Sequence, residues 1–265
     1  MKVQIILNSS DKMSAVKIDK GELVSFIKDN EELIHQKGSP GWNRSEIEMF
    51  PIIGPTSKNN NKVSTLKGEG VQDQHGLLRE LKYNFVDSSE TKAVFEKTYK
   101  AGTKIRNDKF PDKSNNEFVF WPFDFSFKKY FELENDSLKI TFEINSEKGM
   151  PFMLGFHPAF KLSGKGDEII EVKDQKVTID EVIKKGGNAF PFFDVEQVNL
   201  IKKVGQNINF KTEGFNNIMF WTQVKNMVCL EPITQYPDLE SQSYSEKNMR
   251  ISKGIEVFSV EISTF

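Results

Sequence analysis

Two ionisable side chains, far apart along the chain, each stand directly before a proline. His157 lies in residues 155–160 (GFHPAF), and Glu231 lies in residues 230–232 (LEP). A residue before proline favours extended backbone, so both side chains should project from strand-like segments. A histidine and a carboxylate can serve as a proton donor and acceptor near neutral pH. This chemistry requires that the fold bring the two residues together.

Glu231 carries the strongest local signal. Alternation in residues 227–231 (MVCLE) places it on the same side of a strand as Met227 and Cys229, and Pro232 is expected to end the strand ladder. A carboxylate on such a buried face is costly unless something binds or uses it. The structural alternative is a salt bridge to an inward-facing lysine or arginine.

The three histidines differ in their surroundings. Phe156 and Phe160 predict an apolar setting for His157, where the ring needs a partner, and a main-chain carbonyl could be that partner. His75 precedes a glycine, and a loop histidine that caps a short helical turn explains it as well as a functional role does. His35 lies in a polar stretch, so we expect it to be exposed and assign it no role.

Composition excludes several classes of protein. The chain has 265 residues with 36 basic and 38 acidic side chains, which gives no electrostatic footprint for nucleic acid or an anionic membrane. The single Cys229 allows no internal disulfide. Residues 1–7 lack the apolar stretch of a signal peptide, and no apolar run is long enough to cross a bilayer. We therefore expect a soluble, cytoplasmic protein, either a monomer or a homodimer.

Period-two alternation recurs along the chain and predicts an all-β fold. In residues 138–145 (LKITFEIN), every second side chain is apolar, as in a half-buried antiparallel strand. Weaker signals lie at residues 3–7, 22–27, 93–99, 118–127, 168–172, 207–211, 227–230 and 255–262. In the last segment the apolar parity shifts between Val257 and Phe258, which indicates a bulge.

Helical periodicity is not sustained anywhere, although residues 77–81 and 239–249 could each hold a turn or two. The 23 phenylalanines are best explained by a β core, and a ligand-binding face is the alternative explanation. Residues 1–265 are therefore predicted to form one large antiparallel β-sandwich domain with few short helices.

Several motifs in order resemble those of the aldose 1-epimerase, or galactose mutarotase, superfamily, especially its LacX-like branch. They are residues 21–26 (GELVSF), Trp42, residues 50–54 (FPIIG), His75-Gly76 with Arg79, residues 155–160 (GFHPAF), residues 230–232 (LEP) and residues 236–238 (YPD). Each motif alone is weak. Their order, and their spread over most of the chain, make the combination specific.

The resemblance implies a twisted β-supersandwich whose concave face binds a pyranose, and an isomerase that exchanges its α and β anomers without cofactor or metal. Glu231 would take the proton of the anomeric hydroxyl, and His157 would protonate the ring oxygen. We expect an ionised glutamate and a protonated histidine at rest, because the two charges attract. His75 would bind the sugar, and Arg79 and Arg44 are candidates for binding hydroxyl groups or phosphate.

Aromatic rings stack on the C–H faces of sugars, so Trp221, Phe220 and Trp42 are candidate platforms. Asn217 is a candidate substitute for the aspartate with which the family holds sugar hydroxyls. Classical galactose mutarotases follow the histidine with a hydroxyl residue and a tyrosine. This chain has residues 158–159 (PA) there, as the LacX-like branch does. The sugar is therefore left open, with an unphosphorylated aldose favoured.

Three alternatives stay open. One is a carbohydrate-binding protein of the same fold without catalysis, and a second is a hexose-6-phosphate mutarotase. The third is a metalloenzyme that uses His75, His157 and Glu231 as ligands, since three protein ligands suffice for a catalytic site. Closely spaced ligand pairs such as H-x-H are absent from the sequence, which weakens the metal alternative.

Overall fold

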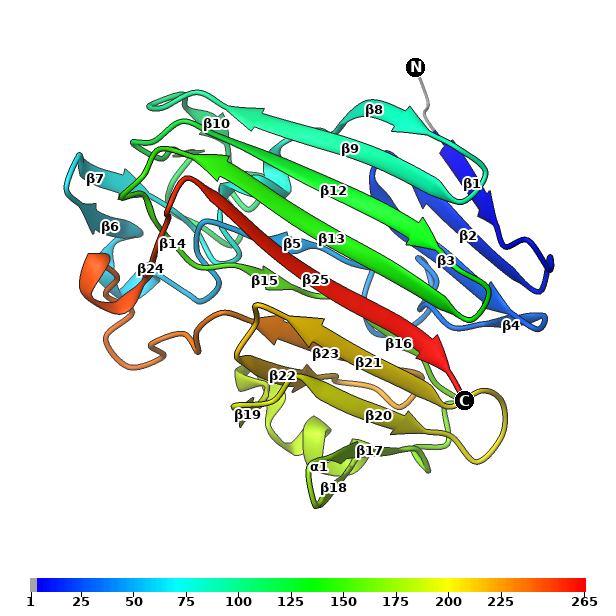
Figure 1. The fold of residues 1–265 in the computed structure, drawn as a ribbon. Coiled ribbons are helices and arrows are strands. Elements are labelled where there is room, and N and C mark those ends of the chain that lie inside the picture. The colour runs from blue at the N-terminus through cyan, green and yellow to red at the C-terminus, as the bar shows by residue number, and fades with distance from the viewer. Residues whose placement is uncertain (1–3) are drawn as a thin grey trace.

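A nine-stranded antiparallel sheet forms one layer of the computed structural model, which describes residues 4–265. Its strand order is β18-β17-β20-β21-β25-β13-β12-β9-β8 (Figure 1). The strands are β8 Asn84–Ser88, β9 Lys92–Tyr99, β12 Phe125–Leu133, β13 Ser137–Ser146, β17 Ile169–Val172, β18 Gln175–Thr178, β20 Gln197–Ile201, β21 Ile208–Glu213 and β25 Ile255–Thr264. Strand β12, and strand β13 as far as Ile144, alternate between buried and half-buried side chains, which explains their clear sequence signal.

A second sheet, of six strands, forms the other layer. Its order is β19-β22-β23-β15-β5, and β16 also pairs with β23. The strands are β5 Glu48–Met49, β15 Gly155–Phe156, β16 Ala159–Lys161, β19 Phe190–Phe193, β22 Asn217–Trp221 and β23 Met227–Ile233. In Figure 1, β5 and β15 lie behind β13 and β25. The layers meet through aromatic rings, because Phe156 packs on Phe142 of β13 and Phe160 packs on Phe210 of β21, with ring centroids 5.0 and 5.7 Å apart.

Smaller elements cover the edges of this sandwich. The N-terminal sheet consists of β1 Gln4–Asn8, β2 Ser14–Asp19, β3 Glu22–Lys28 and β4 Glu31–Glu32. The two-stranded sheets are β6 Lys62–Thr65 with β7 Gly68–Val71, β10 Ile105–Arg106 with β11 Phe118–Val119, and β14 Pro151–Phe152 with β24 Arg250–Ile251. One hydrophobic core draws side chains from Leu7 to Ile262.

Helices are few and short, as predicted. They are α1 Ile179–Lys184 and the 3-10 turns η1 Ser57–Asn59, η2 Leu77–Glu80, η3 Gly186–Asn188 and η4 Glu246–Asn248. Turn η2 matches the turn predicted at residues 77–81, whereas only η4 lies within residues 239–249. Among the described residues, no helix combines the length and apolar character that a membrane crossing demands.

The all-β prediction is confirmed, but some strand boundaries were wrong. Residues 118–127 form no single strand, since β11 ends at Val119 and β12 begins at Phe125. Pro122 lies in the break and has no backbone N–H for a ladder. For the first predicted strand, residues 3–7, the structure has β1 from Gln4, and residue 3 lies outside the described residues.

The bulge predicted near Val257 is absent from the described strand β25. Its pairing with β13 keeps one register from Ser263 to Ile255. Ile255 and Val257 point outward, 64 and 57 % exposed, while Phe258 points into the core. The shift in apolar parity therefore reflects two exposed apolar side chains rather than an extra residue.

Candidate active site

The two predicted catalytic residues face each other across neighbouring strands. Strands β15 and β16 pair with β23 in one register, with Gly155 opposite Ile233 and Ala159 opposite Cys229. The same register places His157 opposite Glu231. Nε2 of the histidine lies 3.3 Å from Oε1 of the glutamate, and the two side chains are 7 and 4 % exposed. The structure thus brings together two groups that the sequence separates widely.

Strand alternation decides which way these side chains point. Phe156 packs into the core between the sheets, so His157 lies on the opposite face of the second sheet. Strand β23 continues through Pro232 to Ile233, because proline tolerates extended backbone. The expectation that Pro232 ends the ladder was therefore wrong. On this opposite face, His157 and Glu231 line a cavity of about 990 Å³.

Two tryptophans form an aromatic wall of the cavity. The Trp42 ring stacks on His157, with centroids 4.5 Å apart and planes inclined by 29°. Trp221 meets His157 edge-on at 5.8 Å and Trp42 at 6.4 Å. His35 supports this wall, since its Nε2 lies 2.8 Å from the Trp42 carbonyl oxygen. It is only 1 % exposed, so the prediction of an exposed histidine was wrong.

His75 reaches the same cavity from a tight loop. Its backbone has φ +74°, and its N–H donates to the carbonyl of Ile53 at 3.1 Å. The next residue, Gly76, has φ +69°, and a Cβ there would lie 2.2 Å from the carbonyl oxygen of Phe50. Only glycine fits this approach. The loop holds the His75 ring edge-on to His157, with centroids 5.7 Å apart.

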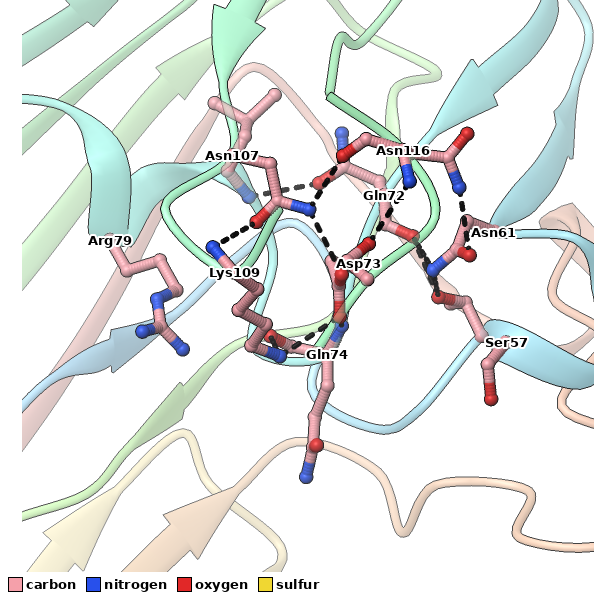
Figure 2. A network of polar contacts seen from close by, with 12 residues as sticks. Ser57, Asn61, Gln72, Asp73, Gln74, Arg79, Asn107, Lys109 and Asn116 are labelled. Atoms are coloured by element: carbon pink, nitrogen blue, oxygen red, sulfur yellow. Dashed lines mark hydrogen bonds and ion pairs between the residues drawn. The ribbon is translucent and has the colours of Figure 1, made fainter. Parts of the chain in front are cut away.

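A polar network behind His75 holds a second loop at the cavity. Asp73 accepts hydrogen bonds from Asn107 Nδ2 at 3.0 Å and from Lys109 Nζ at 2.9 Å (Figure 2). Lys109 also donates to the Gln74 carbonyl, while the Gln74 side chain extends away from the network. Asn116 donates to Asn61 on the far side. The network ties residues 107–116 to the loop that carries His75.

These residues were not predicted, because polar side chains in a loop look like ordinary surface residues.

Positive and negative side chains share the cavity rim. Arg44 and Arg79, both predicted binders, line the cavity. The Nε atom of Arg79 lies 3.2 Å from Oε1 of Glu80. The other charged residues that line the cavity are Lys109, Lys113, Asp73, Asp108 and Asp112. The rim is therefore mixed in charge, and two of its cations already have carboxylate partners.

A profile of the aldose 1-epimerase family matches residues 7–250. The chain belongs to the aldose 1-epimerase family. No curated protein matches the sequence.

Solved structures agree with this family on the fold. A galactose mutarotase-like protein from Lactobacillus casei superposes with a TM-score of 0.80 at 18 % identity, over 99 % of this chain and 100 % of the other. A galactose mutarotase related enzyme from Lactobacillus acidophilus gives 0.76 at 18 % identity, over 99 and 97 %. A GalM/aldose epimerase homologue from C. elegans gives 0.61 at 10 % identity, over 100 and 99 %. The fold is therefore galactose mutarotase-like, and membership of the LacX-like branch stays a prediction.

Two residues considered as sugar binders lie outside the cavity of this aldose 1-epimerase family member. Phe220 is fully buried and packs on Phe192, because alternation along β22 turns it to the core face. Asn217 lies at the start of β22, where its Oδ1 accepts from the backbone N–H of Asp194 at 3.4 Å. Trp221, on the other face of β22 from Phe220, does line the cavity.

Burial sets the protonation of the site and reverses our expectation. Removal from water, with a smaller contribution from the positive charge of Arg79, lowers the pKa of His157 to about 3. Burial raises the pKa of Glu231 to about 8. The proton therefore sits on Glu231 at neutral pH, and His157 is neutral. Burial, followed by the neighbouring His157, also holds the pKa of His75 well below its ordinary value.

Proposed function

We propose that this protein is a mutarotase that interconverts the α and β anomers of an aldopyranose. One observation carries the proposal: Nε2 of His157 and Oε1 of Glu231 lie 3.3 Å apart on the wall of a cavity large enough for a sugar. Ring opening needs one group to take the proton of the anomeric hydroxyl and another to supply a proton to the ring oxygen. Each such group contributes about 10²–10⁴-fold.

The pair carries one transferable proton. In the free site burial keeps this proton on Glu231, so a bound sugar must shift it towards His157 before the carboxylate can act as base. Sugar hydroxyls that donate to the carboxylate favour its ionised form, as hydrogen bonds to a charged group do. His157 then holds the proton that the ring oxygen receives. When the ring closes on the other face of C1, the transfers run in reverse.

The cavity suits a neutral, hydroxyl-rich ligand. Trp42 and Trp221 offer apolar faces for the sugar C–H groups. Neutral polar side chains that line the cavity, Ser57, Gln74, Asn188 and Gln223, can pair with hydroxyls. Carboxylates lie among the rim cations, which favours an unphosphorylated aldose. Arg44 and Lys113 make a 6-phosphorylated aldose the second candidate.

The test is to follow freshly dissolved α-glucose, α-galactose and their 6-phosphates by polarimetry or saturation-transfer NMR. The wild type should accelerate anomer exchange of at least one sugar, and Glu231→Gln and His157→Asn should each lose at least about 10²-fold. Glu69→Gln, on the exposed strand β7, is the matched control and should keep the full rate. Full activity in either site variant would refute the role given to that residue.

The same experiment separates catalysis from binding. A carbohydrate-binding protein without catalysis would show ligand-induced changes in tryptophan fluorescence, through Trp42 and Trp221, but no faster exchange. Acceleration of the 6-phosphates alone would select the phosphorylated substrate class. Loss of that preference in Arg44→Gln would then assign the phosphate to the rim.

A further inference from the structure

Cys229 lies beside the His157–Glu231 pair on the same face of the second sheet. It stands two residues before Glu231 on β23 and opposite Ala159 of β16. A ring nitrogen of His157, Sγ of Cys229 and a carboxylate oxygen of Glu231 all lie within 4.8 Å of one another. All three residues are buried. We propose that they form a site for a thiophilic divalent cation of the Zn²⁺ type.

The donor set selects the class of cation. Zn²⁺ binds histidine nitrogen, cysteine sulfur and carboxylate oxygen, whereas Mg²⁺ and Ca²⁺ take oxygen ligands. In a tetrahedral Zn²⁺ site the ligand atoms lie about 3.3–3.8 Å apart, given the usual metal–ligand lengths. His157 Nε2 and Glu231 Oε1 are already 3.3 Å apart. The thiol needs to move by only about 1 Å to complete three protein ligands.

An unsatisfied polar atom points to a ligand at the same place. Among the residues described, Oε1 of Glu231 is buried and has no hydrogen-bond partner. The contact of 3.3 Å between the two side chains does not have hydrogen-bond geometry. A buried polar atom without a partner is unfavourable. A cation that binds Oε1 of the carboxylate removes this penalty.

Cysteine, not the second histidine, completes the set. The sequence-based metal alternative joined His75 to His157 and Glu231, but the clustered ligand atoms are those of His157, Glu231 and Cys229. Trp42 and Trp221 pack against the small cluster that Cys229 forms with Ala159 and Met227, in which the thiol is buried. The cation would enter from the cavity, which His157 and Glu231 line, and the protons of the Cys229 thiol and the Glu231 carboxyl group would leave to solvent. Water from the cavity would take the fourth position.

Cation and sugar must compete, because both use His157 and Glu231. Micromolar Zn²⁺ would therefore inhibit anomer exchange, and a chelator would restore it. This consequence rests on the proposed mutarotase function, whereas the cation site itself does not.

The experiment titrates the purified protein with Co²⁺, in the absence of sugar and with a phosphine reductant. A 1:1 complex with a thiolate-to-cobalt charge-transfer band and displacement by Zn²⁺ is the expected result. Cys229→Ser should abolish the band. Cys229→Ser, His157→Asn and Glu231→Gln should each weaken Zn²⁺ affinity by at least roughly tenfold, since even supporting residues of metal sites have that effect.

His75→Asn is the matched control and should keep both the band and the affinity. Near-UV circular dichroism verifies the fold of each variant, and Cys229→Ala replaces Cys229→Ser if the latter does not fold. The site is refuted if the wild type shows no thiolate band, if both cysteine variants bind Zn²⁺ as tightly as the wild type, or if His75→Asn weakens binding as much as His157→Asn does. A protein that binds Zn²⁺ but fails to accelerate anomer exchange would refute the mutarotase proposal alone.

Discussion

The buried carboxyl group of Glu231 makes the free energy of unfolding depend on pH. Its side chain is 4 % exposed, and burial raises its pKa from the ordinary 4.5 to about 8. Between these pH values the unfolded chain has released a proton that the folded chain still holds. The stability that goes with this proton is fully present below about pH 4.5 and is lost as the pH rises through about 8.

The substitution Glu231→Gln isolates this effect, because glutamine imitates the protonated acid at every pH. Each unit of pKa shift corresponds to about 1.4 kcal/mol, so the full shift would amount to several kcal/mol. The carboxylate lies on a cavity wall that water can reach, which lowers the expected value to roughly 2–4 kcal/mol. The free energy of unfolding of the variant should equal that of the wild type near pH 4.5. It should exceed the wild-type value increasingly as the pH rises, and the difference should become constant above pH 8.

Reversible urea unfolding, followed by tryptophan fluorescence at half-unit steps from pH 5 to 9, measures this difference. His157 gives the opposite pH dependence, because its lowered pKa reduces the free energy of unfolding as the pH falls below 6.5. Both proteins contain His157, so this effect cancels in the comparison. Glu69→Gln, at an exposed position of β7, is the control for the loss of a carboxylate. A flat difference between wild type and Glu231→Gln would show that the glutamate is ionised throughout, and would refute the neutral pair.

Three further predictions concern the support of the site. Lys129→Met should lower the free energy of unfolding in urea by about 3–5 kcal/mol, because it leaves the buried Glu46 and Glu48 without their shared partner; a loss below 1 kcal/mol would contradict this. Trp221→Ala should raise KM about tenfold with a smaller change in kcat, as loss of a stacking face predicts, and an unchanged KM would remove Trp221 from the sugar site. Gly76→Ala should lower the free energy of unfolding by about 2 kcal/mol, because the added Cβ would meet the carbonyl of Phe50. It should also lower kcat/KM, because the same loop carries His75. A variant as stable as the wild type would contradict this prediction.

Strands with two unlike faces were predictable from the sequence. Residues 138–145 lie within β13, whose inward side chains are buried and whose outward ones are polar. The pattern failed where both faces carry apolar residues, as at the start of β25, or where proline interrupts an aromatic-rich run, as at Pro122. Helix α1 had a local signal that was overlooked: Thr178 and Glu181 form a capping box, the S/T-x-x-E pattern of a helix start.

The supporting residues of the site were harder to predict, because their roles depend on contacts between distant segments. His35 has polar neighbours in sequence, yet the fold buries it beneath Trp42. Lys109 lies in a loop rich in charged residues, and its bond to Asp73 spans 36 positions. Lys129 occupies an inward-facing position of β12, and the carboxylates that tolerate it there come from the segment around β5. No local pattern contains such information.

The pattern of backbone hydrogen bonds between the strands explains why a residue before proline is suited to each position of the proposed catalytic pair. The backbone N–H of Thr234 donates to Leu154, and that of Leu162 donates to Asn226, which fixes the hydrogen-bonded pairs between β23 and β15–β16. His157 and Glu231 fall in between, as a non-hydrogen-bonded pair.

Side chains approach most closely at such pairs, because the Cα atoms are about 4.5 Å apart rather than about 5.5 Å. His157 instead exchanges both of its backbone hydrogen bonds with Ile47, at 2.9 and 3.3 Å. Pro158 and Pro232 lie in the two hydrogen-bonded pairs on either side of the His157–Glu231 pair. Each proline lacks the backbone N–H that would donate to the neighbouring strand, but it holds the preceding residue extended. A shift of one residue would turn Glu231 into the core, so the register that pairs the strands also creates the proposed acid–base pair.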